Sequence, residues 1–205
     1  MNPEAVIRST LESAVPEPRE SDLRVLHTHL ATRAEREDIL DVTYQVVDSP
    51  HGRLLLAATA AGLVRVAFER EDHDVVLASL VDTIGPRILA ADERTREAAR
   101  QIEEYFAGQR REFELDLDLR LVTGFRRTVV GHLADIPYGS TATYAAVAKA
   151  AGNPGAVRAA GSACSHNPIP IVVPCHRVVR SDGSPGNYLG GTETKAAMLR
   201  MEAVA

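Results

Sequence analysis

The hydrophobic pattern changes its period twice along the chain. Leu23, Leu26 and Leu30 recur at helical spacing after two prolines, so the first 40 residues are expected to form two short helices or to be partly disordered. Turn signals at 49–52 and 61–62 then separate short runs that are typical of β-strands. These runs, predicted to pair as an antiparallel meander, are 42–47, 53–59 and 63–68.

Two helices and a further strand are predicted after the meander. Apolar positions 75, 76 and 80 fit a helix that begins after Asp72. Asp92 is predicted to cap a longer helix that continues through Phe106 and stops at Gly108. Apolar residues at 113, 115, 117 and 119 alternate with charged neighbours, which predicts a strand facing one core. Residues 41–120 are therefore interpreted as an α/β domain, a small antiparallel sheet with helices, and residues 1–40 as an extension.

Past residue 120 short helices replace most of the strand signals. Thr123 is predicted to cap a helix over 125–134, and Thr143 to cap another over 144–151. The segment 152–154, Gly-Asn-Pro, breaks that helix before a third one over 157–165. Two short helices joined by a tight glycine-containing turn are typical of a helix-turn-helix. Residues 121–205 are thus predicted to be a mainly α, helix-turn-helix domain.

Composition and charge narrow the class of protein. Of 205 residues, 45% are hydrophobic and 25% charged, as in ordinary globular domains. No apolar run approaches the roughly 18 residues that span a bilayer, and the start lacks the pattern of a secretory signal, so a cytoplasmic protein is expected. Residues 1–119 carry a net charge of −10 and residues 120–205 one of +5. Only the second half is therefore expected to meet a polyanion.

The most specific segment surrounds Cys175. This cysteine follows an apolar run and lies between Pro174 and His176, in Pro-Cys-His-Arg-Val. The prolines stiffen the backbone and so fix the direction of the thiol. Thiolate is the reactive form, and a neighbouring histidine or arginine is expected to lower the pKa of a cysteine toward neutrality. The segment therefore predicts a nucleophilic cysteine rather than a buried, inert one.

These residues and their surroundings resemble the O6-alkylguanine-DNA alkyltransferase family. The family signature, Pro-Cys-His-Arg-Val, lies at residues 174–178. Further positions match the family in order and spacing, namely residues 152–154, 158–161, 167–168 and 186–191, Lys195 and Glu202. It is specific over residues 124–202 and rests on pattern alone over 42–119. It implies a ribonuclease-H-like first domain, a winged-helix-like second domain, and transfer of an alkyl group from guanine O6, and less strongly from thymine O4, to the protein's own cysteine.

The resemblance implies a catalytic role for five residues. Cys175 is the nucleophile and final acceptor, His176 the base that acts on the thiol through a water, and Glu202 the carboxylate that orients the imidazole. Tyr144 donates a hydrogen bond or proton to the departing guanine. Asn167 ties the recognition helix to the cysteine loop. No cofactor is implied.

The resemblance also implies how DNA is bound. A base inside a duplex cannot be reached, so the nucleotide is extruded, and Arg158 fills the space that it leaves. The small residues Ala159 and Gly161 suit close approach to the minor groove of double-stranded DNA. Further contacts to DNA or the alkylated base are assigned to Asn153, Val178, Ser181 and Tyr188. A monomer without membrane association is expected.

Some features depart from the family pattern or leave alternatives. Leu189 stands where relatives commonly carry a small or hydroxylated residue, and Cys164 occupies a pocket wall where it could oxidise with Cys175. The histidines of 27–29 are the only suggestive metal cluster, and no metal is expected. A lesion-binding sensor without activity is an alternative, although such proteins lack the cysteine. A Cys–His hydrolase would leave the helix pair with its arginine unexplained.

Overall fold

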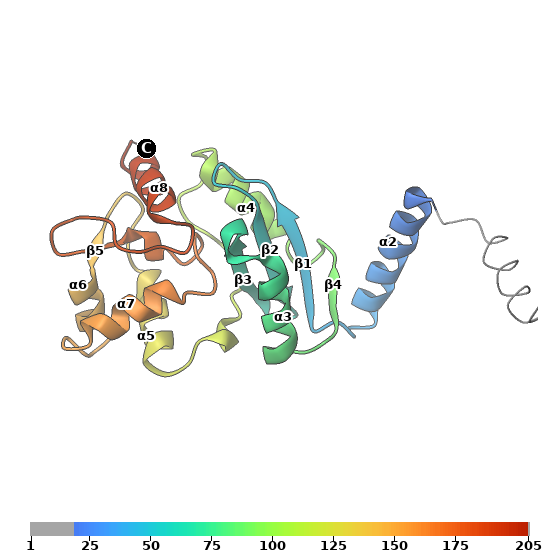
Figure 1. Ribbon diagram of the computed structural model, residues 1–205, viewed down its shortest axis with the longest axis horizontal. Helices are drawn as coiled ribbons and strands as arrows, with labels where there is room; N and C mark the ends of the chain where they lie inside the picture. Colours follow the sequence, from blue (N-terminus) through green and yellow to red (C-terminus); the bar gives the residue numbers. More distant parts are fainter. Residues whose placement is uncertain (1–18, 205) are drawn as a thin grey trace, which may run out of the picture. The chain divides into compact units, whose positions relative to one another are not determined.

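The computed structural model describes residues 19–204, and its contacts divide the chain into two units, residues 1–39 and 40–205 (Figure 1). The described part of the first unit is dominated by helix α2 (Glu20–Arg36). An ion pair one turn apart, Arg24 to Glu20 at 2.9 Å, supports this helix. The described residues thus form one helix, and the rest of the expectation for 1–40 falls on residues 1–18, outside the described part.

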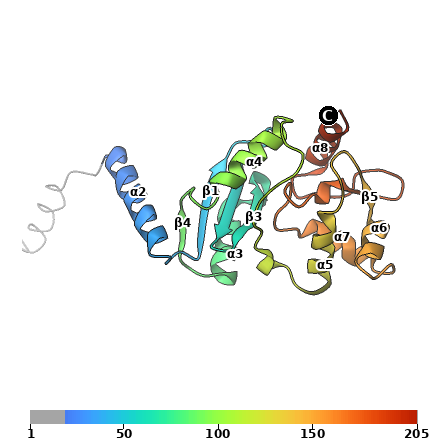
Figure 2. The same cartoon turned by 180° about the vertical axis from the view of Figure 1, so that it is seen from behind.

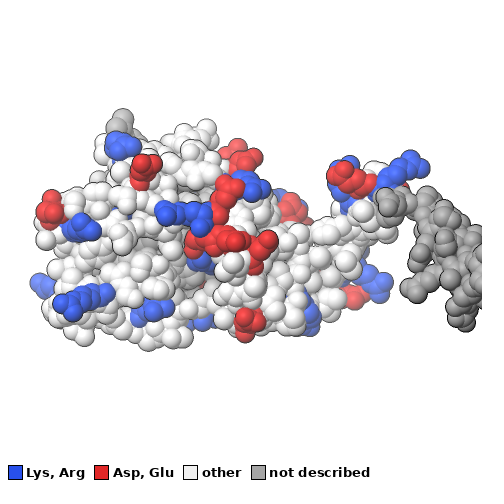
Figure 3. All heavy atoms as spheres, viewed as in Figure 1, with Lys and Arg blue, Asp and Glu red and all other residues white. Residues whose placement is uncertain are grey.

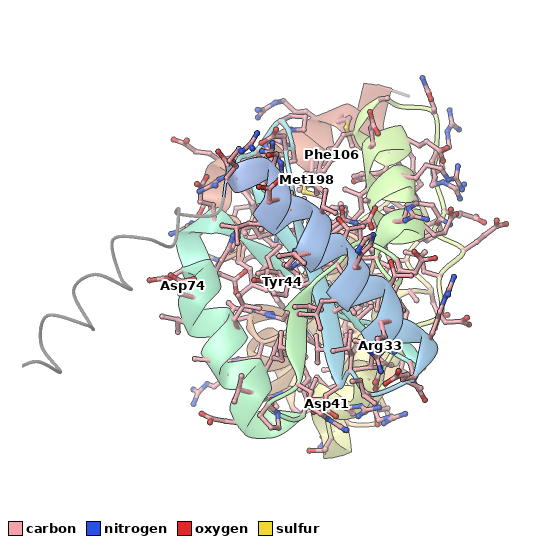
Figure 4. All side chains as sticks on the ribbon, turned by 90° about the vertical axis from the view of Figure 1, so that its right-hand side faces the viewer. Arg33, Asp41, Tyr44, Asp74, Phe106 and Met198 are labelled. Atoms are coloured by element: carbon pink, nitrogen blue, oxygen red, sulfur yellow. The ribbon has the colours of Figure 1, made fainter. Side chains whose placement is uncertain are left out.

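In the second unit, β1 (Val42–Val47), β2 (Leu54–Thr59) and β3 (Gly62–Phe68) form the predicted antiparallel meander. A fourth strand that the pattern did not predict, β4 (Ile88–Ala90), runs parallel to β1, so the sheet is mixed with the order β3-β2-β1-β4. Three half-buried residues are too few to show a period. Asp41, labelled in Figure 4, accepts a 2.5 Å hydrogen bond from Arg87 and ties the two strand starts together.

Helices cover both faces of this sheet, which explains why every residue of β2 is buried (Figures 1 and 2). Leu55 and Ala57 face one cluster together with Val76 and Leu80 of α3 (His73–Thr83). The alternate residues of β2 face a second, larger cluster that includes α4 (Arg96–Phe106) and the C-terminal helices. The period of two along a strand therefore distributes its side chains between two cores.

The predicted strand over 113–119 is wrong as a regular element. The structure has a single bridge there, between Leu117 and Leu63, although the apolar side chains do pack on the large core as expected. The ladder stops because another segment occupies the edge of β3: the Val66 N–H donates to the carbonyl of Pro168 at 2.8 Å. The edge of the sheet is thus shared with the segment that leads to Cys175.

Two predicted helix caps also differ. Asp92 does not cap α4, whose N-cap is Thr95; the Asp92 carbonyl instead accepts from the N–H groups of Thr95 and Arg96 in the turn before the helix. Thr123 is the N-cap of α5 (Gly124–Leu133), but its side chain makes no capping bond. The cap at Thr143 is confirmed, since its hydroxyl accepts from Ala146 N–H at 3.1 Å.

The C-terminal part is mainly helical, as predicted. After the short η2 (Leu119–Leu121), α5 packs with α6 (Tyr144–Ala150) and α7 (Val157–Ser165), and α6 and α7 pack on each other. The short strands β5 (Ala142–Thr143) and β6 (Val178–Val179) pair in parallel. The turn η3 (Cys175–Arg177) and α8 (Thr192–Val204) complete the chain. One apolar cluster runs through both parts, and the border predicted at residue 120 stays a prediction.

Candidate active site

Cys175 opens the turn η3 at the end of a buried segment and is 2% exposed. The chain reaches it through residues 169–173, all of which are buried. Ile171 has a positive φ of 76°, an unusual conformation for a β-branched residue. Cys175 N–H donates to the Val173 carbonyl at 2.8 Å, which closes a tight turn before the thiol. The direction of the thiol is therefore set by a constrained backbone, as the prolines predicted.

Asn167 braces this segment from within. Its side chain is fully buried; the amide Nδ2 donates to the Val173 carbonyl at 2.8 Å, and Oδ1 accepts from Ile169 N–H at 3.1 Å. One side chain thus joins the end of α7 to both ends of the loop before Cys175. These two hydrogen bonds agree with the predicted role of Asn167 in tying the recognition helix to the cysteine loop, which stays a prediction.

His176 and Glu202 form a buried pair, as the family resemblance implied. His176 Nε2 lies 2.9 Å from Glu202 Oε1, and both side chains are at most 1% exposed. The other ring nitrogen, Nδ1, is buried and has no hydrogen-bond partner among the described residues. Because a carboxylate only accepts, Nε2 must carry the hydrogen, and Nδ1 is left with a free lone pair.

Glu202 receives more donors than the sequence indicated. Arg177 donates to both carboxylate oxygens, through Nε to Oε2 at 3.0 Å and through Nη2 to Oε1 at 3.0 Å. The Gly139 N–H donates to Oε2 at 3.2 Å, and the Tyr105 hydroxyl donates to Oε1 at 2.8 Å. Burial opposes the charge, but hydrogen bonds from His176, Arg177 and Tyr105 prevail and lower the pKa of Glu202 to about 2. The carboxylate is therefore ionised at neutral pH.

The pKa of the Cys175 thiol differs from the value that the motif predicted. Burial raises the pKa of Cys175 to about 11, although a hydrogen bond with Asn167 and the charge of Lys195 act in the opposite direction. Burial also lowers the pKa of His176, with the charge of Glu202 opposing it. The resting pair is thus a neutral thiol beside a neutral imidazole. The expectation of a thiol pKa near neutrality is wrong, because burial outweighs the hydrogen bond with Asn167 and the charge of Lys195.

Tyr144 and Lys195 lie beside the thiol. Burial raises the pKa of Tyr144, and the neighbouring thiols Cys164 and Cys175 add to the rise. Lys195 is fully buried; its Nζ donates to the Val178 carbonyl at 2.5 Å and lies 5.8 Å from the centre of the Tyr144 ring. The ring face thus meets a cation, which is a favourable arrangement, while the charge of Arg180 opposes the rise in the pKa of Tyr144.

Tyr188 supports the histidine from the loop before α8. Its ring lies 6.2 Å from the His176 ring and 5.5 Å from that of Phe68, and its hydroxyl donates to Met198 Sδ at 3.7 Å. Met198 on α8 is fully buried and is labelled in Figure 4. Tyr188 therefore forms a wall beside the imidazole, consistent with its predicted place in the pocket.

Of the residues predicted to meet DNA or the alkylated base, four are exposed, whereas Gly161 is half-buried and Val178 and Tyr188 are buried. Arg158 and Ala159 are exposed at the start of α7, while Ala160 next to them is buried in the helix interface. Asn153 and Ser181 are also exposed. In Figure 3, Lys and Arg are spread over the C-terminal part, and Asp and Glu gather over the part that holds the sheet.

The structure therefore brings the predicted catalytic residues together and leaves the exposed, predicted DNA-binding residues outside that site. Cys175, His176, Glu202 and Asn167 form one buried site with Tyr144 at its edge, whereas the exposed residues lie outside it. Sequence reasoning missed two contributors. Arg177 stands inside the Pro-Cys-His-Arg motif, which was its signal. Tyr105 is an apolar-face position of a distant helix, and no local pattern could have connected it to Glu202.

Among the described residues, no group of three or more histidine, cysteine, aspartate or glutamate side chains could hold a metal ion. Within the same residues, no helix is long and apolar enough to cross a membrane.

A buried thiol held beside a histidine–glutamate pair, next to a helix-turn-helix, defines a protein that couples a reactive cysteine to nucleic-acid recognition. Two family models match the chain: the ribonuclease-like domain of 6-O-methylguanine DNA methyltransferase over residues 42–119, and the DNA-binding domain of the same protein over residues 124–204. The chain belongs to the 6-O-methylguanine DNA methyltransferase family, and the predicted resemblance and fold class are confirmed.

Individual relatives agree with this assignment. The methylated-DNA–protein-cysteine methyltransferase of Methanosarcina acetivorans is 40% identical over 160 residues, covering 78% of this chain and 97% of the relative. That of Mycolicibacterium paratuberculosis is 39% identical over 161 residues, covering 78% and 92%. The crystal structure of Mycobacterium tuberculosis O6-methylguanine methyltransferase has a TM-score of 0.70 at 37% identity, covering 80% and 93%. A structure of the Mycobacterium tuberculosis protein in complex with DNA has a TM-score of 0.68 at 38% identity, covering 79% and 93%.

Proposed function

We propose that this protein repairs alkylated DNA by moving a methyl or larger alkyl group from guanine O6 to Sγ of its own Cys175, with O4-alkylthymine as a secondary substrate. The observation that carries the proposal is the buried arrangement of Cys175, His176 and Glu202, in which a neutral imidazole keeps one free lone pair. The names of the relatives, all methylated-DNA–protein-cysteine methyltransferases, support the same reaction.

The chemistry balances without a cofactor. His176 Nδ1 takes the thiol proton through a water as the sulfur attacks the alkyl carbon. The carbon–sulfur bond forms while the carbon–O6 bond breaks, and its electron pair stays on guanine. Tyr144 stabilises that charge by donating a hydrogen bond or a proton to guanine. In the net change, one proton moves from the sulfur of Cys175 to guanine. Ionised Glu202 stabilises the imidazolium that forms in between.

A thiol with a raised pKa suits this scheme. A thiolate already present at pH 7 would be exposed to oxidation and metal ions. With the pKa near 11, the thiolate forms only as His176 accepts the proton during attack. The thioether product is stable, and no residue in the site offers a way to cleave it. Each molecule therefore acts once.

DNA binding is proposed to use the exposed start of α7. Arg158 enters the duplex through the minor groove and replaces the extruded nucleotide, while exposed Ala159 and partly buried Gly161 allow the backbone to approach closely. Asn153 and Ser181 contribute contacts from neighbouring loops. Val178, Tyr188 and the backbone of the loop 186–191 line the pocket for the flipped base. The protein is proposed to act as a monomer in the cytoplasm.

The main alternative is a sensor that binds the lesion without reacting. A sensor needs neither a nucleophile nor a base, whereas this protein has Cys175 and His176. Two hydrogen bonds of Asn167 hold the loop before Cys175, and three hydrogen bonds to Glu202 hold the carboxylate beside His176. Intact mass separates the two. After mixing with O6-methylguanine DNA, the protein should gain one methyl group of about 14 Da on the peptide with Cys175. No gain, or methyl on Cys164, contradicts the assignment; Cys175→Ser should lose the gain and keep DNA binding.

A further inference from the structure

Tyr105 reaches the site from the opposite half of the molecule. It lies on α4, in the part matched by the ribonuclease-like domain, and is fully buried. Its hydroxyl donates to Glu202 Oε1 at 2.8 Å and lies 3.4 Å from His176 Nε2. The phenol thus touches both members of the pair that the C-terminal part supplies.

The contact is directed rather than a by-product of packing. Tyr138 belongs to the same aromatic group, with its ring 6.2 Å from that of Tyr105, yet its buried hydroxyl has no hydrogen-bond partner among the described residues. The Tyr105 hydroxyl, by contrast, donates to the oxygen that also accepts from His176. Arg177 Nη2 donates to the same oxygen at 3.0 Å, and these donors together fix where Oε1 sits, which in turn fixes the imidazole ring.

We propose that Tyr105 is a positioning residue for the alkyl transfer: its hydroxyl holds Glu202 Oε1 against His176 Nε2, so that His176 keeps Nδ1 free as the base. The inference rests on the function proposed above. It also assigns a task to the ribonuclease-like part, which delivers this hydroxyl from α4. Without it, Glu202 would keep Arg177, which also donates to Oε1, but lose the uncharged donor that shares this oxygen with the imidazole.

The groups around His176 determine the direction of the expected effect. Glu202 favours the imidazolium, while burial and the positive charges of Arg177 and Lys195 disfavour it. The Tyr188 ring packs on the imidazole, and Tyr138 faces Tyr105. A donor to Glu202 Oε1 withdraws charge from the oxygen that faces His176. Removing the Tyr105 hydroxyl should therefore stabilise the imidazolium and leave less neutral base at a given pH.

The test measures the rate at which free O6-benzylguanine alkylates Cys175 from pH 5.5 to 9. Tyr105→Phe keeps the ring and removes the hydroxyl. In this variant the acidic limb of the plot of rate against pH should move to higher pH by roughly half a unit to one unit. The reaction should then be about threefold to tenfold slower on that limb and hardly slower above pH 8. Tyr138→Phe is the matched control, since it removes a hydroxyl from the same aromatic group without removing a hydrogen bond, and its profile should stay that of the wild type.

Each outcome decides between the claims. A profile of Tyr105→Phe that is unchanged, or lowered equally at every pH, would show that the hydroxyl serves packing alone and overturns the inference. A wild-type protein that gains no benzyl group on Cys175 overturns the proposed function itself, and with it this inference. Should Tyr105→Phe fold poorly, ¹⁵N NMR of the wild-type imidazole gives an independent answer: hydrogen on Nε2 agrees with the proposal, and hydrogen on Nδ1 contradicts it.

Discussion

Gly186 leaves the space that the Tyr144 hydroxyl occupies. A Cβ atom built on Gly186 would meet Tyr144 Oη closer than real Cβ atoms approach other atoms, and it would lie 3.1 Å from the Cζ atom of Tyr144, which is a tight contact. The φ angle of Gly186 lies outside the left-handed region, so the need for glycine here comes from space and not from backbone conformation. The loop 186–191 and the start of α6 are thereby fitted to each other at the edge of the site.

Gly186→Ala should therefore displace the Tyr144 ring and narrow the site. We expect slower reaction with O6-benzylguanine than in the wild type, and a smaller loss with O6-methylguanine in DNA, because the benzyl group needs more room. Rates of Cys175 alkylation with both substrates measure this. Gly131→Ala on α5 is the control, since a Cβ there meets nothing within 4 Å. Equal rates for Gly186→Ala and the wild type would contradict the fit.

His176→Ala should make alkylation depend on the thiolate already present. With the thiol pKa near 11, the ionised fraction at pH 7 is about one in ten thousand and grows about tenfold for each pH unit. The rate with free O6-benzylguanine should therefore rise steeply up to pH 10 in the variant and much less in the wild type. Profiles of the same shape would refute the base role of His176 and leave it a structural residue.

Glu202→Gln should cost stability as well as rate. Arg177 is buried and directs three hydrogen bonds to this carboxylate, so the variant leaves a buried guanidinium without its counter-charge. A loss of about 3 kcal/mol in the free energy of unfolding at pH 7 is expected. Urea titrations measure it, and a loss below about 1 kcal/mol would show that Arg177 finds other compensation.

The same carboxylate should shape the acid stability of the wild type. Its pKa is lowered from 4.5 to about 2 in the folded state, so the stability that it contributes is present above pH 4.5 and is lost as pH falls toward 2. Urea titrations between pH 5 and 2 should show a steeper loss in the wild type than in Glu202→Gln, which has no proton to take up at that position. Parallel curves would contradict the assignment.

Arg158→Ala should slow repair in duplex DNA about tenfold to a hundredfold and leave the reaction with free O6-benzylguanine unchanged, because the free base needs no extrusion. Lys149→Ala removes an equal charge from the preceding helix, where the side chain is also exposed, and separates general attraction to DNA from insertion into the duplex. Equal losses on both substrates for Arg158→Ala would assign the arginine to the chemistry or the fold.

The sequence by itself determined the elements whose signals are local. The short runs and the turn signals between them identified the meander of β1 to β3, and the glycine-containing turn between α6 and α7 identified the helix pair. The motif around Cys175 predicted the nucleophile. Each of these depends on neighbours within a few residues, and such patterns report which face of an element is buried and where the chain turns.

Only the tertiary structure decided the rest. Tyr105 lies 97 residues from Glu202, and nothing in its helix distinguishes it from an ordinary core aromatic. The predicted strand at 113–119 was replaced by a single bridge because Pro168, from a distant segment, bonds to the edge of β3. The pKa of Cys175 depends on how completely the fold removes water from the thiol, and that burial outweighs the hydrogen bond with Asn167 and the charge of Lys195. Contacts between distant segments set these properties, and local patterns do not encode which segments will meet.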